Sequence, residues 1–287
     1  MPIVVEGLGY TYMKKSPYEK RALDGVSFTI NDGDFVTIVG QTGSGKSTLL
    51  QHLNGIIKLT EGKIVVDDID LTARRPDYKR LRFTVGMVFQ YPEYQLFDET
   101  VVKDVGFGCR NAGLTPEETE ERVRVAIEQV GLDYEAVKDR SPFELSGGQK
   151  RRVAIAGVIA MRPKVLVLDE PTAGLDPKGK QDILQLIQHL HRDVCHTIIL
   201  VCHDMETVAA MANRVLVLNG SRLIYDLTPM ELFKKGEEIA SLGLDMPVGV
   251  ALTAYLREKG WDIPLCLTPQ QATEAICAYL RRDGYGA

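Results

Sequence analysis

The 287-residue sequence has no apolar run that approaches 18 residues, the length that a helix needs to cross a bilayer. Its first residues, MPIVVEGLGYTY, also lack the basic stretch and apolar core that mark a secretory signal. These absences predict a protein that does not span a membrane and carries no signal peptide. It can still sit on a membrane protein.

An excess of basic residues and paired cysteine motifs are missing as well. The chain carries 34 Lys and Arg against 39 Asp and Glu, a net charge of −5, which disfavours nucleic acid as the main partner. None of the five cysteines stands in a CxxC pair, so reduced thiols in a cytosolic protein are the simplest interpretation. With 45% hydrophobic residues, the chain can form one large domain or two smaller ones.

Glycine and serine, by contrast, are concentrated in GQTGSGKSTLL, which follows the apolar run FVTIV. Glycine loses more backbone freedom on folding than any other residue, so this cluster at a strand end indicates that bare backbone is needed there. The spacing Gly-x4-Gly-Lys-Ser is that of a phosphate-binding P-loop, and the helix that follows adds its N-terminal dipole. The predicted nucleotide-binding residues are Gly40, Gln41, Thr42, Gly43, Ser44, Gly45, Lys46, Ser47 and Thr48.

Two carboxylates, Asp169 and Glu170, end another apolar run, VLVLDE. Asp169 is expected to hold Mg²⁺ with Ser47, directly or through water, because this ion prefers hard oxygen donors. Glu170 is expected to orient or deprotonate the water that attacks the γ-phosphate. The alternative, two solvated acids at a polar strand end, does not account for the P-loop in the same chain.

Two further side chains follow predicted parallel strands. His203 ends ILVCH, and since the carboxyl ends of parallel strands face one crevice, its imidazole is placed to hydrogen-bond a γ-phosphate. Gln90, in VGMVFQYPEYQLF, can reach Mg²⁺ or the attacking water and is therefore a candidate both for catalysis and for metal binding. A structural histidine and a surface glutamine are the alternatives.

A second loop rich in glycine, ELSGGQKRR, precedes the apolar helix RVAIAGVIAM. Its Ser146, Gly147, Gly148 and Gln149 place N–H groups at a helix start, which makes a second anion site in the same chain. A lone Ser-Gly-Gly is usually a turn, but its position between the P-loop and VLVLDE favours a nucleotide role.

The order of elements indicates three parts. β-rich segments come first, a helical stretch occupies about residues 93–160, and β/α alternation then resumes. Thr115 and Glu118 form a capping-box sequence with Pro116 at the first helical position, so a helix is expected from there to Gly131. Runs such as VLVL and TIILV fit parallel strands that are covered on both faces.

Residues 241–287 form an appendage with two short amphipathic helices. The expected apolar face of the first helix consists of Val248, Leu252, Tyr255 and Leu256, and that of the second of Ala272, Ile276, Tyr279 and Leu280. Each face must pack on something, either the chain's own core or the same tail of a partner.

Taken in order, these motifs resemble the ATPase subunit of ABC transporters over about residues 3–235. The matching motifs are Walker A in GQTGSGKST, the Q-loop at Gln90, the signature at Leu145–Gln149, Walker B in VLVLDE, the D-loop in AGLD with Asp176, and the switch histidine at His203. The resemblance implies an α/β P-loop NTPase fold of the ABC type with an N-terminal antiparallel β subdomain.

The same resemblance implies ATP and Mg²⁺ as ligands and hydrolysis of ATP. It also implies head-to-tail dimers, in which the signature and Asp176 of one subunit close over ATP on the P-loop of the other. An aromatic residue near the N-terminus is expected to stack on adenine; Tyr12 fits the spacing best and Tyr10 second.

A narrower resemblance links the chain to energy-coupling factor (ECF) importers of vitamins and metal ions. It rests on YTYMKKSPYEKRAL, FQYPEYQLFDETVVKDVGFG, PFELSGGQKRRVAIAGVIAM and the helical tail, and it is greatest to the second of two ATPase subunits. Gln41 stands where histidine is frequent, and Cys202 where threonine is frequent. Residues 1–240 would be the ABC ATPase domain, with a helical subdomain at about 93–160, and residues 241–287 a C-terminal helical extension that can dimerise.

This narrower resemblance also implies partners and a location. The expected partners are a second ATPase subunit (a heterodimer favoured, a homodimer possible), a transmembrane coupling subunit and a membrane substrate-binding subunit, without nucleic acid. The protein would lie peripherally on the cytoplasmic face of the cell membrane. There are three rival classes. Soluble ABC proteins of translation or repair would share the core but usually carry two such cassettes or a long coiled coil. A P-loop module without hydrolysis would lack Glu170 or the signature, and an exporter ATPase would lack the ECF-like segment after Gln90. The resemblance implies that the membrane substrate-binding subunit, and not this chain, selects the transported substrate.

The segment YPEYQLFDET, directly after Gln90, is the expected docking place for the membrane subunit. Glu93, Asp98 and Glu99 would pair with arginines of a coupling helix through charge-assisted hydrogen bonds. The neighbouring aromatic side chains would cover that helix. Without the resemblance, a solvated loop would be the simpler interpretation.

Overall fold

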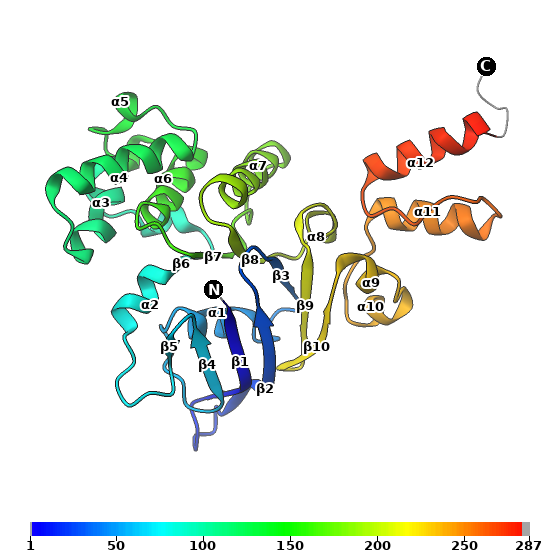
Figure 1. Cartoon of the computed structure of the whole chain (residues 1–287), viewed down its shortest axis with the longest axis horizontal. Helices are drawn as coiled ribbons and strands as arrows, with labels where there is room; N and C mark the ends of the chain where they lie inside the picture. Colours follow the sequence, from blue (N-terminus) through cyan, green and yellow to red (C-terminus); the bar gives the residue numbers. More distant parts are fainter. Residues whose placement is uncertain (1, 283–287) are drawn as a thin grey trace.

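Two β-sheets carry the nucleotide loops in the computed structural model, which describes residues 2–282 (Figure 1). The first sheet is antiparallel and has the order β2-β1-β4-β5. Its strands are β1 (Ile3–Tyr12), β2 (Lys20–Ile30), β4 (Lys63–Val66) and β5 (Ile69–Asp70). It forms the antiparallel β subdomain expected near the N-terminus.

The second sheet has the order β10-β9-β3-β8-β7-β6, and all its neighbours are parallel except β10 and β9. Its strands are β3 (Phe35–Val39), β6 (Val85–Val88), β7 (Val165–Asp169), β8 (Thr197–Val201), β9 (Arg214–Asn219) and β10 (Arg222–Leu227). The parallel order brings the ends of β3, β6, β7 and β8 to one edge, which is where the predicted site residues follow.

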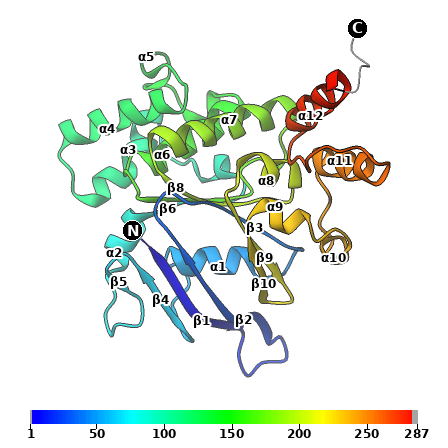
Figure 2. The ribbon, with the colours of Figure 1, turned by 45° about the vertical axis from the view of Figure 1, so that its right-hand side comes forward.

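Both faces of this second sheet are buried, as its continuous apolar runs predict. In β7, Val165 and Val167 point into one core, which also contains the first sheet and α1 (Lys46–Leu53). Leu166 and Leu168 point into the other core, which the helices cover. Figure 2 shows α1 between the two sheets.

A group of helices stands beside β6 and β7 (Figure 1). It comprises the 3-10 turns η1 (Pro92–Gln95) and η2 (Pro142–Glu144) and the helices α3 (Val101–Ala112), α4 (Pro116–Gln129), α5 (Tyr134–Val137) and α6 (Gly147–Ile159). The capping box of Thr115 and Glu118 is confirmed, since each side chain bonds the other's backbone N–H. The remaining helices of the ATPase part are α2 (Tyr78–Thr84), α7 (Pro177–Asp193), α8 (Met205–Met211), α9 (Pro229–Phe233) and α10 (Glu237–Ser241).

The C-terminal helices α11 (Val248–Glu258) and α12 (Pro269–Arg282) pack on one another at one end of the molecule (Figures 1 and 2). The apolar face predicted for α11 does not pack on the chain's own core: Val248, Leu252 and Tyr255 are exposed and Leu256 is half-buried, whereas Val250 and Thr253 are buried. The buried Thr253 hydroxyl accepts a hydrogen bond from the Cys266 N–H at 3.1 Å, which fixes the loop between the helices. The sequence pattern therefore marks the outer face of α11.

The face predicted for α12 lies toward the chain itself. Ala272 is buried, Ile276 and Leu280 are half-buried, and Tyr279 stacks on Trp261 with ring centroids 4.5 Å apart. Among residues 2–282, no helix is both long enough and apolar enough to cross a bilayer.

Candidate nucleotide site

The P-loop is held in a shape that requires glycine at two positions. Gly40 has φ 146°, and a Cβ there would lie 2.0 Å from the Leu218 carbonyl oxygen. Gly45 has φ 109°, and a Cβ there would lie 2.4 Å from the carbonyl oxygen of Ala22. Both are closer than real Cβ contacts, so the loop between β3 and α1 can approach its neighbours only with bare backbone.

Lys46 is almost fully buried, and its ammonium binds carbonyl oxygens of the P-loop itself. Its Nζ donates to the carbonyl oxygens of Gly40 at 2.7 Å and Gln41 at 3.0 Å. Burial lowers the pKa of Lys46, while the negative charges of Glu170 and Asp169 act against that fall. The buried Ser44 hydroxyl oxygen has no hydrogen-bond partner within residues 2–282. The loop thus presents a cation and a free hydroxyl next to its N–H groups.

A cavity of about 550 Å³ lies against this loop. Its lining consists of Tyr12, Lys20, Ala22, Thr42, Gly43, Gly45, Lys46, Ser47, Thr48, Gln90, Glu170 and His203. Residues from four distant parts of the sequence meet here because β3, β6, β7 and β8 end at the same edge of the parallel sheet.

Glu170 is the centre of a three-residue cluster at the mouth of this cavity. Gln90 Nε2 donates to Glu170 Oε2 at 3.0 Å, and His203 Nε2 lies 2.6 Å from Glu170 Oε1. The backbone of Glu170 is in the left-handed region, with φ 49°, a conformation that residues other than glycine adopt mainly at turns and functional sites. The three predicted catalytic side chains are therefore brought together.

Asp169 precedes Glu170 and is buried at 7% exposure. Burial raises the pKa of its carboxyl above the ordinary value, while the neighbouring Ser47 hydroxyl and the Lys46 ammonium act against the rise. A carboxylate and a hydroxyl oxygen side by side at a phosphate-binding loop form a donor set that suits Mg²⁺.

Of the two tyrosines considered for adenine, only Tyr12 lines the cavity. Its hydroxyl lies 3.2 Å from Thr48 Oγ1, and its ring is 37% exposed. Tyr10 supports it from behind, edge-on to Tyr12 at 4.8 Å and to His52 at 4.9 Å. His52 was not foreseen; it is fully buried, burial lowers its pKa, and its Nδ1 lies 2.7 Å from the Thr48 carbonyl oxygen.

The signature residues lie away from the cavity. Ser146 caps α6 in a second capping box, in which Gln149 accepts from the Ser146 N–H at 3.1 Å and donates its own N–H to the Ser146 hydroxyl at 3.3 Å. The pattern Ser-x-x-Gln would have predicted this cap. Ser146, Gly147 and Gly148 are exposed. Asp176 also stands apart, where it caps α7 by accepting from the Gly179 N–H at 2.7 Å.

The segment after Gln90 differs from its prediction. Glu93 does not face solvent but forms a bidentate pair with Arg151, which is only 2% exposed, at 2.9 and 2.6 Å. Burial favours a higher pKa for Glu93, but the hydrogen bonds from Arg151 hold that pKa below its ordinary value. Asp98 faces Arg110 at 3.4 Å, and Glu99 pairs with Lys103 at 2.6 Å. The expected row of free acids is thus wrong for Glu93, because its partner lies 58 positions away in the sequence.

Two sheets, a helical group and one cavity that joins a P-loop to Glu170, Gln90 and His203 define an ATPase of the ABC type. The chain belongs to the ABC transporter family, whose sequence model matches residues 23–173. Within that family it belongs to the ATP-binding proteins of energy-coupling factor transporters.

Curated relatives and solved structures agree with this placement. The chain is 51% identical to the energy-coupling factor transporter ATP-binding protein EcfA2 of Clostridium perfringens, over 99% of this chain and 100% of that protein. It is 55% identical to the protein of the same name from Clostridium acetobutylicum, over 92% of each chain.

Two solved structures share the fold. One is cbiO1 of Clostridium perfringens, part of the ABC transporter complex cbiONQ, with a TM-score of 0.72 and 39% identity over 89% of this chain and 98% of that chain. The other is the ATP-binding cassette MJ0796 in a dimeric post-hydrolysis state with ADP and Pi. It has a TM-score of 0.68 and 31% identity over 79% of this chain and 98% of that chain.

Proposed function

We propose that this chain binds and hydrolyses ATP as one of the ATPase subunits that energise an ECF importer. The observation that carries the proposal is Glu170, held between Gln90 and His203 at the mouth of the P-loop cavity. A carboxylate at this place can take a proton from a water beside bound phosphate. The relatives named as energy-coupling factor transporter ATP-binding proteins support the role in transport.

ATP would lie along the P-loop. The N–H groups of Gly40–Thr48 and the start of α1 attract the phosphates, and Lys46 would turn from its two carbonyl partners toward them. Tyr12 would stack on adenine, since its ring lines the same cavity. Gln41 and Thr42 contribute backbone to this loop.

Ser47 and Asp169 would hold Mg²⁺, with Gln90 as a third oxygen donor. The fit rests on their chemistry and on the burial of Asp169, whose raised pKa a nearby cation would offset. When bound, the ion neutralises charge on the β- and γ-phosphates.

For hydrolysis, Glu170 would accept the proton of the attacking water. His203, which now contacts Glu170 at 2.6 Å, would hydrogen-bond the γ-phosphate, and Gln90 would orient the water. Both side chains already converge on Glu170, so all three would act at one phosphate.

The signature residues would act on ATP held by a second subunit. Ser146, Gly147, Gly148, Gln149 and Asp176 lie on the surface, away from the chain's own cavity. The dimeric form of the related cassette MJ0796 supports such a pairing. We favour a heterodimer with a second ATPase over a homodimer.

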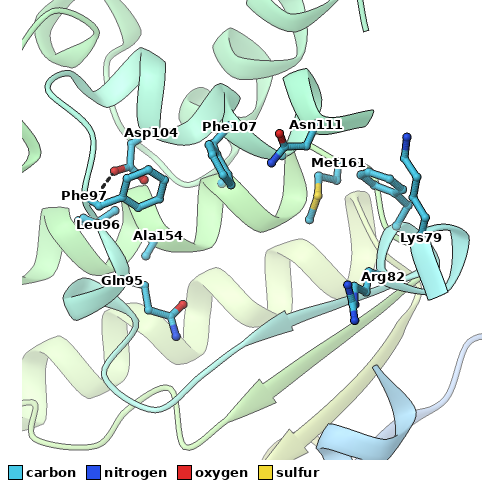
Figure 3. A pocket seen from close by; sticks show the side chains of 13 residues that line it. Lys79, Arg82, Gln95, Leu96, Phe97, Asp104, Phe107, Asn111, Ala154 and Met161 are labelled. Atoms are coloured by element: carbon cyan, nitrogen blue, oxygen red, sulfur yellow. Dashed lines mark hydrogen bonds between the residues drawn. The ribbon is translucent and has the colours of Figure 1, made fainter. Parts of the chain in front are cut away.

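The membrane coupling subunit would dock in a groove of about 670 Å³ between α2 and the helical group (Figure 3). Phe97 and Phe107 lie edge-to-face at 5.0 Å on one wall and are 60% and 44% exposed. Lys79 and Arg82 of α2 lie on the other side. Asp104 holds the wall in place by accepting from the backbone N–H of Phe97 at 2.8 Å, the dashed line in Figure 3. An apolar helix with a few polar side chains fits this lining.

The substitution Phe107→Asp should weaken assembly with the membrane subunit by about thirtyfold, because losing an aromatic anchor costs about 2 kcal/mol or more. ATP binding by the isolated chain should survive. Tyr18→Asp is the matched control, since Tyr18 is 78% exposed and lies in the turn between β1 and β2. Co-purification measures both variants, and equal assembly of the two would remove the groove from this role.

The C-terminal extension, proposed as residues 241–287 beyond an ATPase domain of residues 1–240, would help the ATPase subunits to pair. Residues 283–287 lie outside the described part of the chain. The exposed α11 face of Val248, Leu252 and Tyr255 supports this role. Gln41 of the P-loop donates to the Leu242 carbonyl oxygen at 3.4 Å, so the extension starts next to the nucleotide loop.

In the assembled importer the chain would lie peripherally on the cytoplasmic face of the cell membrane. A membrane substrate-binding subunit would select the cargo, a vitamin or a transition-metal ion, and nucleic acid is not among the proposed partners.

Mass spectrometry of the complex purified from native membranes tests this assembly. We expect a second ATPase, a hydrophobic coupling subunit and a small membrane protein that binds the cargo. Two copies of this chain without another ATPase would replace the heterodimer by a homodimer. A complex without any membrane protein would contradict the transport role.

A further inference from the structure

Arg151 is the one charged residue among the largest fully buried side chains of residues 2–282. Its guanidinium makes four hydrogen bonds in two directions. Two go to the carboxylate of Glu93, and two go to the carbonyl oxygens of Pro171 at 2.9 Å and Ala173 at 3.0 Å. A buried charge is tolerated only when it is paired and hydrogen-bonded in this way.

Arg151 and its partners belong to three parts of the molecule. Arg151 stands in α6, the helix that begins with the signature residues. Glu93 stands in η1, which packs on α6 and leads through Gln95 into the wall of the docking groove. Pro171 and Ala173 follow Glu170 directly, and the Ala173 N–H donates to the Glu170 carbonyl oxygen at 3.0 Å. One side chain thus joins the groove, the signature helix and the chain that carries Glu170.

The backbone on both sides of this junction is strained. Tyr91 has φ 54° and Glu170 has φ 49°, although neither is glycine. Such conformations persist only where the surroundings fix them. Tyr91 also packs on the D-loop, since a Cβ added at Gly174 would lie 3.1 Å from its Cε1. Arg151 Nη1 donates to the carbonyl oxygens of Pro171 and Ala173 and so holds the backbone that follows Glu170.

We propose that Arg151 is a positioning residue for ATP hydrolysis: it sets the place of the Glu170 backbone relative to η1, so that movement of the docking groove reaches the catalytic carboxylate. The inference rests on the proposed function, because it takes Glu170 as the base. Glu93 acts together with Arg151, since its carboxylate holds the guanidinium against η1.

The test measures steady-state hydrolysis by the assembled transporter that carries Arg151→Lys. Lysine keeps the positive charge but lacks the planar fork and cannot hold Glu93 and both carbonyl oxygens at once. We expect kcat to fall about tenfold or more, because small misplacement of a catalytic group has effects of this size. The KM for ATP should stay within about twofold, since the P-loop is not touched.

Arg152→Lys is the matched control on the same helix. Arg152 donates to the Val130 carbonyl oxygen of the helical group, and within residues 2–282 none of its side-chain hydrogen bonds goes to η1 or to the chain after Glu170. Its variant should keep both kcat and KM. Thermal unfolding of all variants shows whether a loss of rate merely follows a loss of folded protein.

A double-mutant cycle with Glu93→Asp completes the test. This change keeps the charge and shortens the side chain by one methylene, so η1 is held less well. If the two residues act as one unit, each single variant and the double variant lose about the same tenfold in kcat. A hundredfold loss in the double variant would mean independent effects and would contradict the proposal.

The outcomes separate this inference from the function on which it rests. If Glu170→Gln abolishes hydrolysis while Arg151→Lys and Glu93→Asp lower only the melting temperature, the pair is structural and the positioning role is overturned. If Glu170→Gln hydrolyses ATP at the normal rate, the proposed function itself fails.

Discussion

The two glycine-rich loops of this chain lie in opposite surroundings. In the P-loop, Gly40 and Gly45 have positive φ, and an added Cβ would collide with backbone oxygens. In the signature loop, nothing described lies within 4 Å of a Cβ added at Gly147 or Gly148. The fold of the chain therefore requires glycine at positions 40 and 45. No contact within the described chain requires glycine at positions 147 and 148, although glycine in a helix costs about 1 kcal/mol.

The same contrast extends to the polar groups. The P-loop cavity gathers Lys46, Glu170 and His203, which come after the separate strands β3, β7 and β8, whereas Ser146 and Gln149 only cap their own helix. One half of the site is complete and the other faces outward. This difference supports the proposal that the signature half serves a molecule outside this chain, namely ATP on the P-loop of a partner subunit.

The largest effect is expected from a substitution in the P-loop half of the site. Glu170→Gln should lower kcat by about 10²- to 10⁴-fold, because an amide cannot take the proton of the attacking water. ATP affinity should stay close to normal, and the closed ATP-bound dimer should accumulate. Steady-state hydrolysis and sedimentation with ATP measure the two effects. Near-normal turnover would remove Glu170 from its assigned role.

The next largest effect is expected from a substitution in the signature loop. Gly148→Asp should lower hydrolysis by the dimer about 10²-fold, since a carboxylate facing phosphates costs several kcal/mol across an interface. Binding of ATP to the isolated chain should be unchanged, which serves as the internal control. A matching loss of affinity in the monomer would place the signature in the chain's own site.

Lys46→Ala should weaken ATP binding by about 10- to 10²-fold, because hydrogen bonds to charged groups contribute about 1.5–3 kcal/mol. Lys20→Ala is the control, since Lys20 lines the same cavity from β2 without belonging to the loop. Titration with a fluorescent ATP analogue compares the two. Equal losses would mean that general positive charge, rather than the loop lysine, binds the nucleotide.

The smallest expected effect compares the glycines directly. Gly148→Ala should raise the free energy of unfolding of the chain by about 0.5–1 kcal/mol, because alanine favours the helix and meets no neighbour. Gly45→Ala should destabilise it, since φ 109° and the Ala22 oxygen exclude a methyl group. Urea unfolding of both variants measures the difference, and a change of the same sign in both would contradict the contrast.

The sequence predicted the P-loop cavity better than the segment after Gln90 and the C-terminal extension. The P-loop, the strand ends of Asp169 and Glu170, and the helix after Thr115 were readable because each depends on neighbours a few positions away. The inward turn of Glu93 was not, since its buried partner Arg151 lies 58 positions later and no local pattern records that pairing.

The helices of the extension show the same limit. Helical spacing identified an apolar stripe on α11 but not the side to which it turns, and Val248, Leu252 and Tyr255 proved to face outward. The side that packs inward carries Val250 and Thr253, which local hydropathy does not single out. Periodicity thus finds a face, while the contacts of the whole fold decide what covers it.

The most direct test of the central claim is the rate of ATP hydrolysis per chain, measured with the ATPase partner over concentrations that span monomer and dimer. Sedimentation at each concentration gives the fraction of paired chains. We predict that the rate per chain rises with that fraction and is close to zero for monomers, because the signature half must come from the partner. A full rate per chain in strictly monomeric protein would contradict the account.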